Sequence, residues 1–234
     1  MGAVRACWLV TLLGCSFHPN ELTPGSDAPH AIDAPDDAPA DAPPTPLLQG
    51  SAASADALTN VDLTGEGLLD WAEWGMTTAT DFNHKATGGG AIANATVTSV
   101  TTIYGYGNNY MGRGNDGFTW SDGTPTAMQP SPQYSGIYVA GQGKGLQTTV
   151  PAGTTTHTLR LYVGAYNATG TLTAHLSDGS APDYTDSSLG NTVSSWAGVY
   201  TLVFRSGSAS ATLNVKWVQN TAGGDVNWSA ASLY

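Results

Sequence analysis

The sequence of 234 residues has only two cysteines, Cys7 and Cys15, and both lie close to its start. Beyond Cys15 the chain therefore cannot form a disulfide bond, a thiolate metal site or a cysteine nucleophile. Basic residues are scarce as well: seven Lys and Arg stand against 18 Asp and Glu, which gives a net charge of −11 at pH 7. Nucleic-acid binding normally needs a basic patch on the protein. We therefore exclude nucleic acid as a partner.

Long apolar runs and helical patterns are also missing. No apolar run reaches the roughly 20 residues that span a lipid bilayer, and no segment keeps a helical apolar period over three turns. Charged residues make up only 11% of the chain, whereas Gly, Thr, Ser and Asn are frequent. This composition favours an extracellular all-β protein over a cytoplasmic helical enzyme.

The first fifteen residues carry a targeting pattern. Arg5 precedes a short apolar run that ends at Leu12–Cys15, and a basic start, an apolar run and a small residue before a cut site are the order of a secretory signal peptide. Because Cys15 follows Gly14, the run resembles the lipobox of bacterial lipoproteins. The resemblance implies cleavage before Cys15, lipid on its thiol and, because Ser16 follows, an outer-membrane location. The alternative is an ordinary signal peptide.

A second segment, residues 15–58, has the composition of a linker. It holds seven acidic residues and no basic one, and it repeats Asp-Ala-Pro at 27–29, 33–35, 37–39 and 41–43. Such a segment buries too little apolar surface to fold, and its prolines keep it extended with a reach on the order of 100 Å. We therefore predict a signal peptide at 1–14, a lipidated and disordered acidic stalk at 15–58, and a folded domain at 59–234.

The predicted domain shows short alternating runs. Leu159, Leu161 and Val163 are apolar and alternate with polar or aromatic neighbours, and similar runs occupy 171–176, 200–205 and 212–217. A period of two with one apolar side predicts half-buried strands. Turn residues such as Gly, Asn, Asp and Pro separate the runs. We predict an all-β fold, an antiparallel β-sandwich of the jelly-roll kind.

A glycine-rich loop with several aromatic residues lies between positions 104 and 122. Aromatic faces with a few planar hydrogen-bonding groups suit the binding of sugars. The candidate ligand-binding residues are Tyr106, Tyr110, Arg113, Trp120 and Asp122. The alternative is a structural loop whose aromatic side chains close one end of the sandwich.

Three acidic residues, Asp178, Asp183 and Asp186, cluster in one predicted loop. Calcium takes six to eight oxygen ligands, and a short acidic loop can supply several of them. We therefore consider a structural calcium ion as a possible cofactor. The alternative is a solvated turn in an acidic protein.

Catalytic patterns are weak. Asp70 and Glu73 flank Trp71, and glycosidases use two acids across the sugar bond. However, residues three apart on a strand point to opposite faces. His175 falls on the polar side of its strand and is expected to be an exposed surface residue. No pair of histidines has metal-ligand spacing, and no Gly-x-Ser-x-Gly motif is present. These patterns indicate a protein that is not an enzyme.

A series of short motifs runs through the predicted domain. They are Val61–Gly67, Asp70–Gly75, Phe82–Lys85, Thr119–Thr126, Gly136–Val139, Leu161–Gly164 and His175–Pro182. With them the chain resembles C-terminal β-sandwich modules that are appended to bacterial secreted proteins, over nearly all of residues 61–234. Such modules accompany carbohydrate-active and adhesive proteins. The resemblance implies a β-sandwich and no particular reaction.

The preferred functional hypothesis is a surface-anchored lipoprotein that displays a non-catalytic carbohydrate-binding domain. Its partners would be the membrane, through the lipid, and a polysaccharide or a cell-surface glycan. One alternative is a structural or adhesive surface protein that binds a protein partner. A less favoured alternative is a hydrolase that uses acids such as Asp70 or Asp122.

Overall fold

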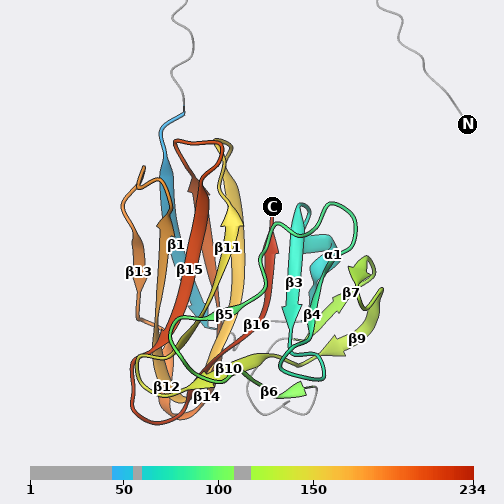
Figure 1. Ribbon diagram of the computed structural model, residues 1–234. Helices are drawn as coiled ribbons and strands as arrows, with labels where there is room; N and C mark the ends of the chain where they lie inside the picture. The colour runs from blue at the N-terminus through green and yellow to red at the C-terminus, as the bar shows by residue number, and fades with distance from the viewer. Residues whose placement is uncertain (1–43, 55–59, 108–116) are drawn as a thin grey trace, which may run out of the picture. The chain divides into compact units, whose positions relative to one another are not determined.

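The computed structural model describes residues 44–54, 60–107 and 117–234 (Figure 1). All of them belong to one compact unit, Pro43–Tyr234. Within the described residues, no helix has the length and apolar character needed to cross a membrane. The unit is built almost entirely from strands, and all but one of the strand pairings among its described residues are antiparallel, so the predicted all-β class is confirmed.

The elements follow one another along the chain in this order: β1 (Leu47–Ser54), β2 (Val61–Asp62), α1 (Leu63–Glu66), β3 (Asp70–Trp74), β4 (Phe82–Lys85), β5 (Thr96–Val97), β6 (Tyr104–Gly105), β7 (Phe118–Trp120), β8 (Gly123–Thr124), β9 (Gln129–Gln133), β10 (Ile137–Ala140), β11 (Gly145–Pro151), β12 (His157–Leu176), β13 (Tyr184–Asp186), β14 (Gly190–Arg205), β15 (Thr212–Gln219) and β16 (Asp225–Leu233).

Two sheets share the long strand β12. The first sheet has the order β1–β14–β12–β16–β3–β4–β8, and β10 also pairs with β16. The second sheet has the order β5–β11–β15–β12–β13, and Figure 1 shows β11, β15 and β12 side by side. The pairing of β12 shifts register between Tyr166 and Ala168, where Asn167 has a left-handed φ of 48°. This bulge carries one strand from the first sheet into the second.

The main core lies between the two sheets. Leu159, Leu161 and Val163 of β12 are at most 2% exposed, as the alternating pattern predicts. The inward residues of β14 and β15 join them in one apolar cluster, which also contains Trp217 and Trp228. Full burial of one such side chain contributes about 1.5–3 kcal/mol to the free energy of unfolding.

A smaller apolar cluster forms on the other side of the first sheet. There α1 and the three-stranded sheet β2–β7–β9 pack against β3, β12 and β14 through Leu63, Phe118 and Trp120. The rings of Trp71 and Trp120 lie 5.3 Å apart in this cluster. The single helical turn α1 begins after Asp62, whose carboxylate accepts the N–H of Thr64 at 3.1 Å. The first sheet is therefore covered on both faces over this region.

Strand β1 corrects the predicted domain boundary. Its eight residues, Leu47–Ser54, pair with β14 along their whole length, from Leu47 opposite Arg205 to Ser54 opposite Gly198. The folded unit therefore begins at or before Leu47, inside the range predicted as stalk. The sequence gives little sign of this strand because its residues are small and alternate only weakly between apolar and polar. Its extended conformation depends on pairing with the edge of β14. Residues 15–43 and 55–58 of the predicted stalk lie outside the described residues.

Candidate functional site

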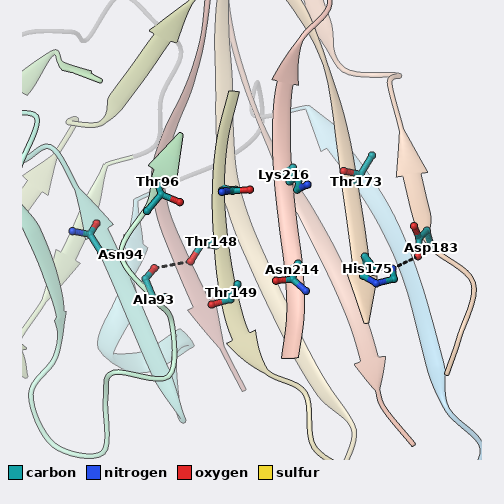
Figure 2. A pocket seen from close by; sticks show the side chains of 11 residues that line it. Ala93, Asn94, Thr96, Thr148, Thr149, Thr173, His175, Asp183, Asn214 and Lys216 are labelled. Carbon is teal, nitrogen blue, oxygen red and sulfur yellow. Dashed lines mark hydrogen bonds and ion pairs between the residues drawn. The ribbon is translucent and has the colours of Figure 1, made fainter. Parts of the chain in front are cut away.

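A hollow of about 560 Å³ lies on the outer face of the second sheet (Figure 2). Its floor consists of the outward side chains of β11, β15 and the second half of β12. The segment Ala93–Thr96 borders it at one edge, and Asp183 borders it at the other. The hollow therefore extends across the width of the second sheet.

Strand periodicity makes this floor polar. In β12 the apolar residues Leu172 and Ala174 point into the core, so Thr173 and His175 point out. In β15 the same alternation buries Val215 and leaves its neighbours on the outer face.

The strand register then brings these outward residues into two rows. One row is Gln147, Lys216 and Thr173, and the other is Thr149, Asn214 and His175. Residues that are directly opposite on neighbouring antiparallel strands have Cβ atoms about 4.5–5.5 Å apart. The second sheet thus presents a compact array of hydroxyl, amide, ammonium and imidazole groups.

His175 is held in place by an acidic partner. Its Nδ1 lies 2.6 Å from Oδ1 of Asp183, and the two side chains are 50% and 58% exposed. The prediction that His175 is an exposed residue on the polar side of its strand is confirmed. Because the contact uses Nδ1, the ring keeps its orientation and Nε2 remains for a ligand.

The opposite edge of the hollow is tied to β11. The hydroxyl of Thr148 donates to the carbonyl of Ala93 at 2.6 Å, and Nε2 of Gln147 donates to the carbonyl of Val97 at 3.3 Å. Asn94 accepts the indole N–H of the buried Trp74 at 3.0 Å. These bonds fix the wall of the hollow before any ligand arrives.

Two of the ligand-binding residues predicted from the sequence, Trp120 and Asp122, form contacts that belong to the fold. Trp120 is only 2% exposed, and its indole N–H donates to the carbonyl of Thr126 at 2.9 Å. Asp122 accepts the indole N–H of Trp71 at 2.9 Å and forms an ion pair with Lys85, also at 2.9 Å. The burial of Trp120 leaves no ring face on which a sugar could stack, which corrects that part of the prediction.

The pKa of Asp122 agrees with a structural role. Partial burial acts to raise the pKa of this carboxyl, but the hydrogen bonds from Thr64, Lys85 and Trp71 outweigh burial and lower the pKa below its ordinary value. Its oxygens are engaged by the protein itself, and it does not line the hollow.

Tyr106 lies apart from the hollow. Its hydroxyl is 2.9 Å from Oγ of Ser229, and its ring centre is 6.4 Å from that of Tyr138. Tyr110 and Arg113, the remaining candidates of this loop, lie outside the described residues.

The three acids considered for calcium engage separate partners. Asp178 accepts from Ser180 and from the N–H of Gly207, Asp183 contacts His175, and Asp186 accepts from Ser188 and Tyr200. Among the residues that the structure describes, no three His, Cys, Asp or Glu side chains gather where they could hold a metal ion. The structure therefore does not bring the predicted calcium ligands together.

Asp70 and Glu73 are both buried with no exposed surface. The carboxylate of Asp70 accepts the N–H groups of Gly90 and Ile92 at 3.0 and 2.8 Å. Glu73 instead accepts from Asn83 at 2.9 Å and from the hydroxyl of Ser135. Because the two acids have different partners and no access to solvent, they cannot act together on a sugar bond.

The comparisons with known proteins do not assign this chain to a family. No family model and no curated protein matches the chain. Solved structures with partial similarity include three that each have a TM-score below 0.5. They are the enzymatically active domain of tailspike protein 4 of bacteriophage CBA120 (15% identity, 61% of this chain, 20% of that chain, TM-score 0.39), TmCBM61 in complex with β-1,4-galactotriose (10%, 43%, 70%, 0.32) and the carbohydrate-binding module CBM6cm-2 of Cellvibrio mixtus lichenase 5A with cellotriose (19%, 58%, 97%, 0.27). The chain thus spans about a fifth of the length of the tailspike chain.

Proposed function

We propose that this protein binds carbohydrate, without catalysis, in the hollow on the outer face of the second sheet. The observation that supports the proposal most strongly is the array of Gln147, Thr149, Thr173 and Asn214 on adjacent strands. Hydroxyl and amide groups can each donate and accept hydrogen bonds. A ligand rich in hydroxyl groups offers both kinds of partner, so sugars match this surface.

The side chains that line the hollow argue against two other classes of ligand. Interfaces with protein partners are enriched in Tyr, Trp, Phe, Met and Arg at their centre, and none of these residues lines the hollow. Pockets for apolar small molecules are lined mostly by hydrophobic and aromatic side chains. Here threonine hydroxyls and amides take their place.

The carboxylates of the hollow argue against hydrolysis. Glycosidases commonly use two carboxyl groups about 5–9.5 Å apart across the sugar bond. Among the described residues that line the hollow, Asp183 is the one acid, and it contacts His175. Binding without turnover is the function that this arrangement supports.

We also propose that the domain is held at a membrane surface. Lipid on Cys15 would anchor the chain at the outer membrane, and the Asp-Ala-Pro segment before β1 would serve as the stalk. Extended polyproline-type chains span about 3.1 Å per residue. A stalk of this length would hold the domain tens of ångströms from the lipid, where it could reach polymers.

The proposal predicts measurable binding to at least one purified polysaccharide. The mature chain with Cys15→Ser would be screened against a panel of neutral and acidic polymers by affinity electrophoresis. Asn214→Ala removes an amide from the middle of the floor and should weaken binding about fivefold, because a lost hydrogen bond costs about 1 kcal/mol. Thr201→Ala, on the outer side of the first sheet, is the matched control and should leave binding unchanged.

Two results would contradict the proposal. One is a folded protein whose migration is not slowed by any polymer of the panel. The other is binding that Asn214→Ala leaves intact, since the ligand would then occupy a different surface.

A further inference from the structure

Lys216 differs from the other basic residues of the described part of the chain. It is the one Lys or Arg there whose charged group has no hydrogen bond or ion pair within the protein. The others serve the fold: Lys85 pairs with Asp122, Arg160 pairs with Glu66, Lys144 donates to Val100, and Arg205 donates to Thr45. Among the described residues of this acidic chain, one cation is therefore left without a partner in the protein.

The position of Lys216 is as informative as its lack of a partner. It lies on β15, the middle strand of the second sheet, and its neighbours across the strands are Gln147 and Thr173, both neutral. Figure 2 shows its side chain on the floor of the hollow. Asp183, the acid that lines the hollow, already contacts His175. The hollow therefore has an available positive charge at its centre.

An unpaired ammonium in a hollow favours a negatively charged ligand. The remaining acidic residues repel anions at long range, but at physiological salt this repulsion is screened beyond about 8 Å. Inside the hollow a ligand meets the ammonium of Lys216 on the middle strand, whereas the carboxylate of Asp183 lies at one edge and contacts His175. A hydrogen bond to a charged group is roughly twice as strong as one between neutral groups.

We propose that the ligand is an acidic polysaccharide, whose anionic substituent pairs with Lys216 while its hydroxyl groups bind Asn214 and the neighbouring threonines. This inference rests on the proposed carbohydrate-binding function and adds the substrate class. Carboxylate groups of uronic acids and sulfate esters share the required charge. Gln147 and Thr173 flank the ammonium and can bind the same substituent through amide and hydroxyl groups.

The test compares polymers that differ only in charge. The mature chain with Cys15→Ser is titrated with polygalacturonate, with the same polymer after reduction of its carboxyl groups, with dextran sulfate and with unmodified dextran. We expect polygalacturonate or dextran sulfate to bind about tenfold more tightly than its neutral counterpart at physiological salt, where the long-range repulsion from the acidic residues is screened. The preference should shrink as salt is raised.

Variants then assign the preference to one residue. Lys216→Gln should remove the preference for the charged polymer and leave the affinity for the neutral polymer within about twofold. Lys144→Gln makes the same change in net charge outside the hollow, and it should keep the preference. A preference for the carboxylated over the sulfated polymer would identify uronic acids as the ligand class, and the reverse would identify sulfate esters.

The two proposals fail in different ways. If the neutral and charged forms bind equally, or if Lys216→Gln and Lys144→Gln weaken binding alike, the acidic-ligand inference is overturned and the binding function stands. If no polymer binds, both are overturned.

Discussion

At the scale of single residues, Glu73 is a buried carboxyl group whose pKa departs far from its ordinary value. It has no exposed surface, and burial raises its pKa from an ordinary value of 4.5 to about 7, even though hydrogen bonds from Ser135 and Asn83 act to lower it. A carboxyl group whose pKa is higher in the folded state than in the unfolded state binds a proton on folding. The stabilising effect of that proton is complete below pH 4.5 and is lost as the pH rises through about 7.

Glu73→Gln should remove this pH dependence. Its amide has nearly the same shape as the protonated carboxyl and can keep both hydrogen bonds. We expect wild type to lose about 3 kcal/mol of unfolding free energy relative to the variant between pH 4.5 and pH 8, because each pKa unit corresponds to about 1.4 kcal/mol. Urea unfolding across this range measures the difference, and parallel curves for the two proteins would show that Glu73 does not titrate as described.

Asp122 gives a second prediction at this scale. Asp122→Ala removes the acceptor of the buried Trp71 indole N–H and the partner of Lys85. We expect the free energy of unfolding to fall by about 1–3 kcal/mol, because a buried donor is left unsatisfied. Asp122→Asn, which keeps an acceptor oxygen, should lower the free energy of unfolding by less.

Polysaccharide binding separates the structural role of Asp122 from the ligand-binding role predicted from the sequence. The folded Asp122→Ala protein should bind as wild type does. Selective loss of binding at full stability would instead return Asp122 to the ligand site.

At the scale of elements, alternation predicted the long strands and missed β1. In β12, β14 and β15 large apolar residues recur at every second position, and the core selects that pattern directly. In β1 the residues are small, so its order depends on an edge of β14 that is more than 140 positions away. Local sequence cannot report such a partner.

The candidate site could not be predicted from the sequence for the same reason. The polar sides of the runs 171–176 and 212–217 are visible in the sequence, but their pairing in register is a property of the assembled sheet. The aromatic residues of the 104–122 region stand out more, and the structure shows that Trp120 belongs to the smaller apolar cluster. Aromatic content therefore indicated packing rather than binding at this position.

A substitution at Gly50 tests whether β1 belongs to the folded unit. A Cβ atom at Gly50 would lie 2.5 Å from the ring of Tyr184, so Gly50→Ala should destabilise the protein by about 1–3 kcal/mol through overpacking. Thermal unfolding measures this loss. In a Tyr184→Ala background the same change should cost much less, because the two residues are in contact.

The control for this prediction is Gly25→Ala, which lies in the predicted stalk and should have no effect. If Gly50→Ala is equally neutral, β1 does not contribute to the stability of the domain, and the boundary near residue 58 is restored.

At the scale of the whole molecule, the proposed function needs a lipid anchor, an acidic stalk and a binding domain in one chain. Cys15→Ser should release the mature protein from the membrane without a change in the melting temperature of the domain, because Cys15 lies outside the compact unit Pro43–Tyr234. Fractionation of cells that produce wild type and variant measures the release, and circular dichroism measures the fold. A variant that is processed and still sediments with membranes would contradict lipid anchoring at this residue.

The central claim is that carbohydrate binds in the hollow of the second sheet, and its most direct test is the location of a bound oligosaccharide. Titration of the isotope-labelled chain with a fragment of its tightest-binding polymer, followed by amide chemical shifts, gives that location residue by residue. We expect the largest shifts at Gln147, Thr173, Asn214 and Lys216 and only small shifts at Tyr106. Saturable binding with its largest shifts around Tyr106 and β10, and none in the second sheet, would contradict the central claim.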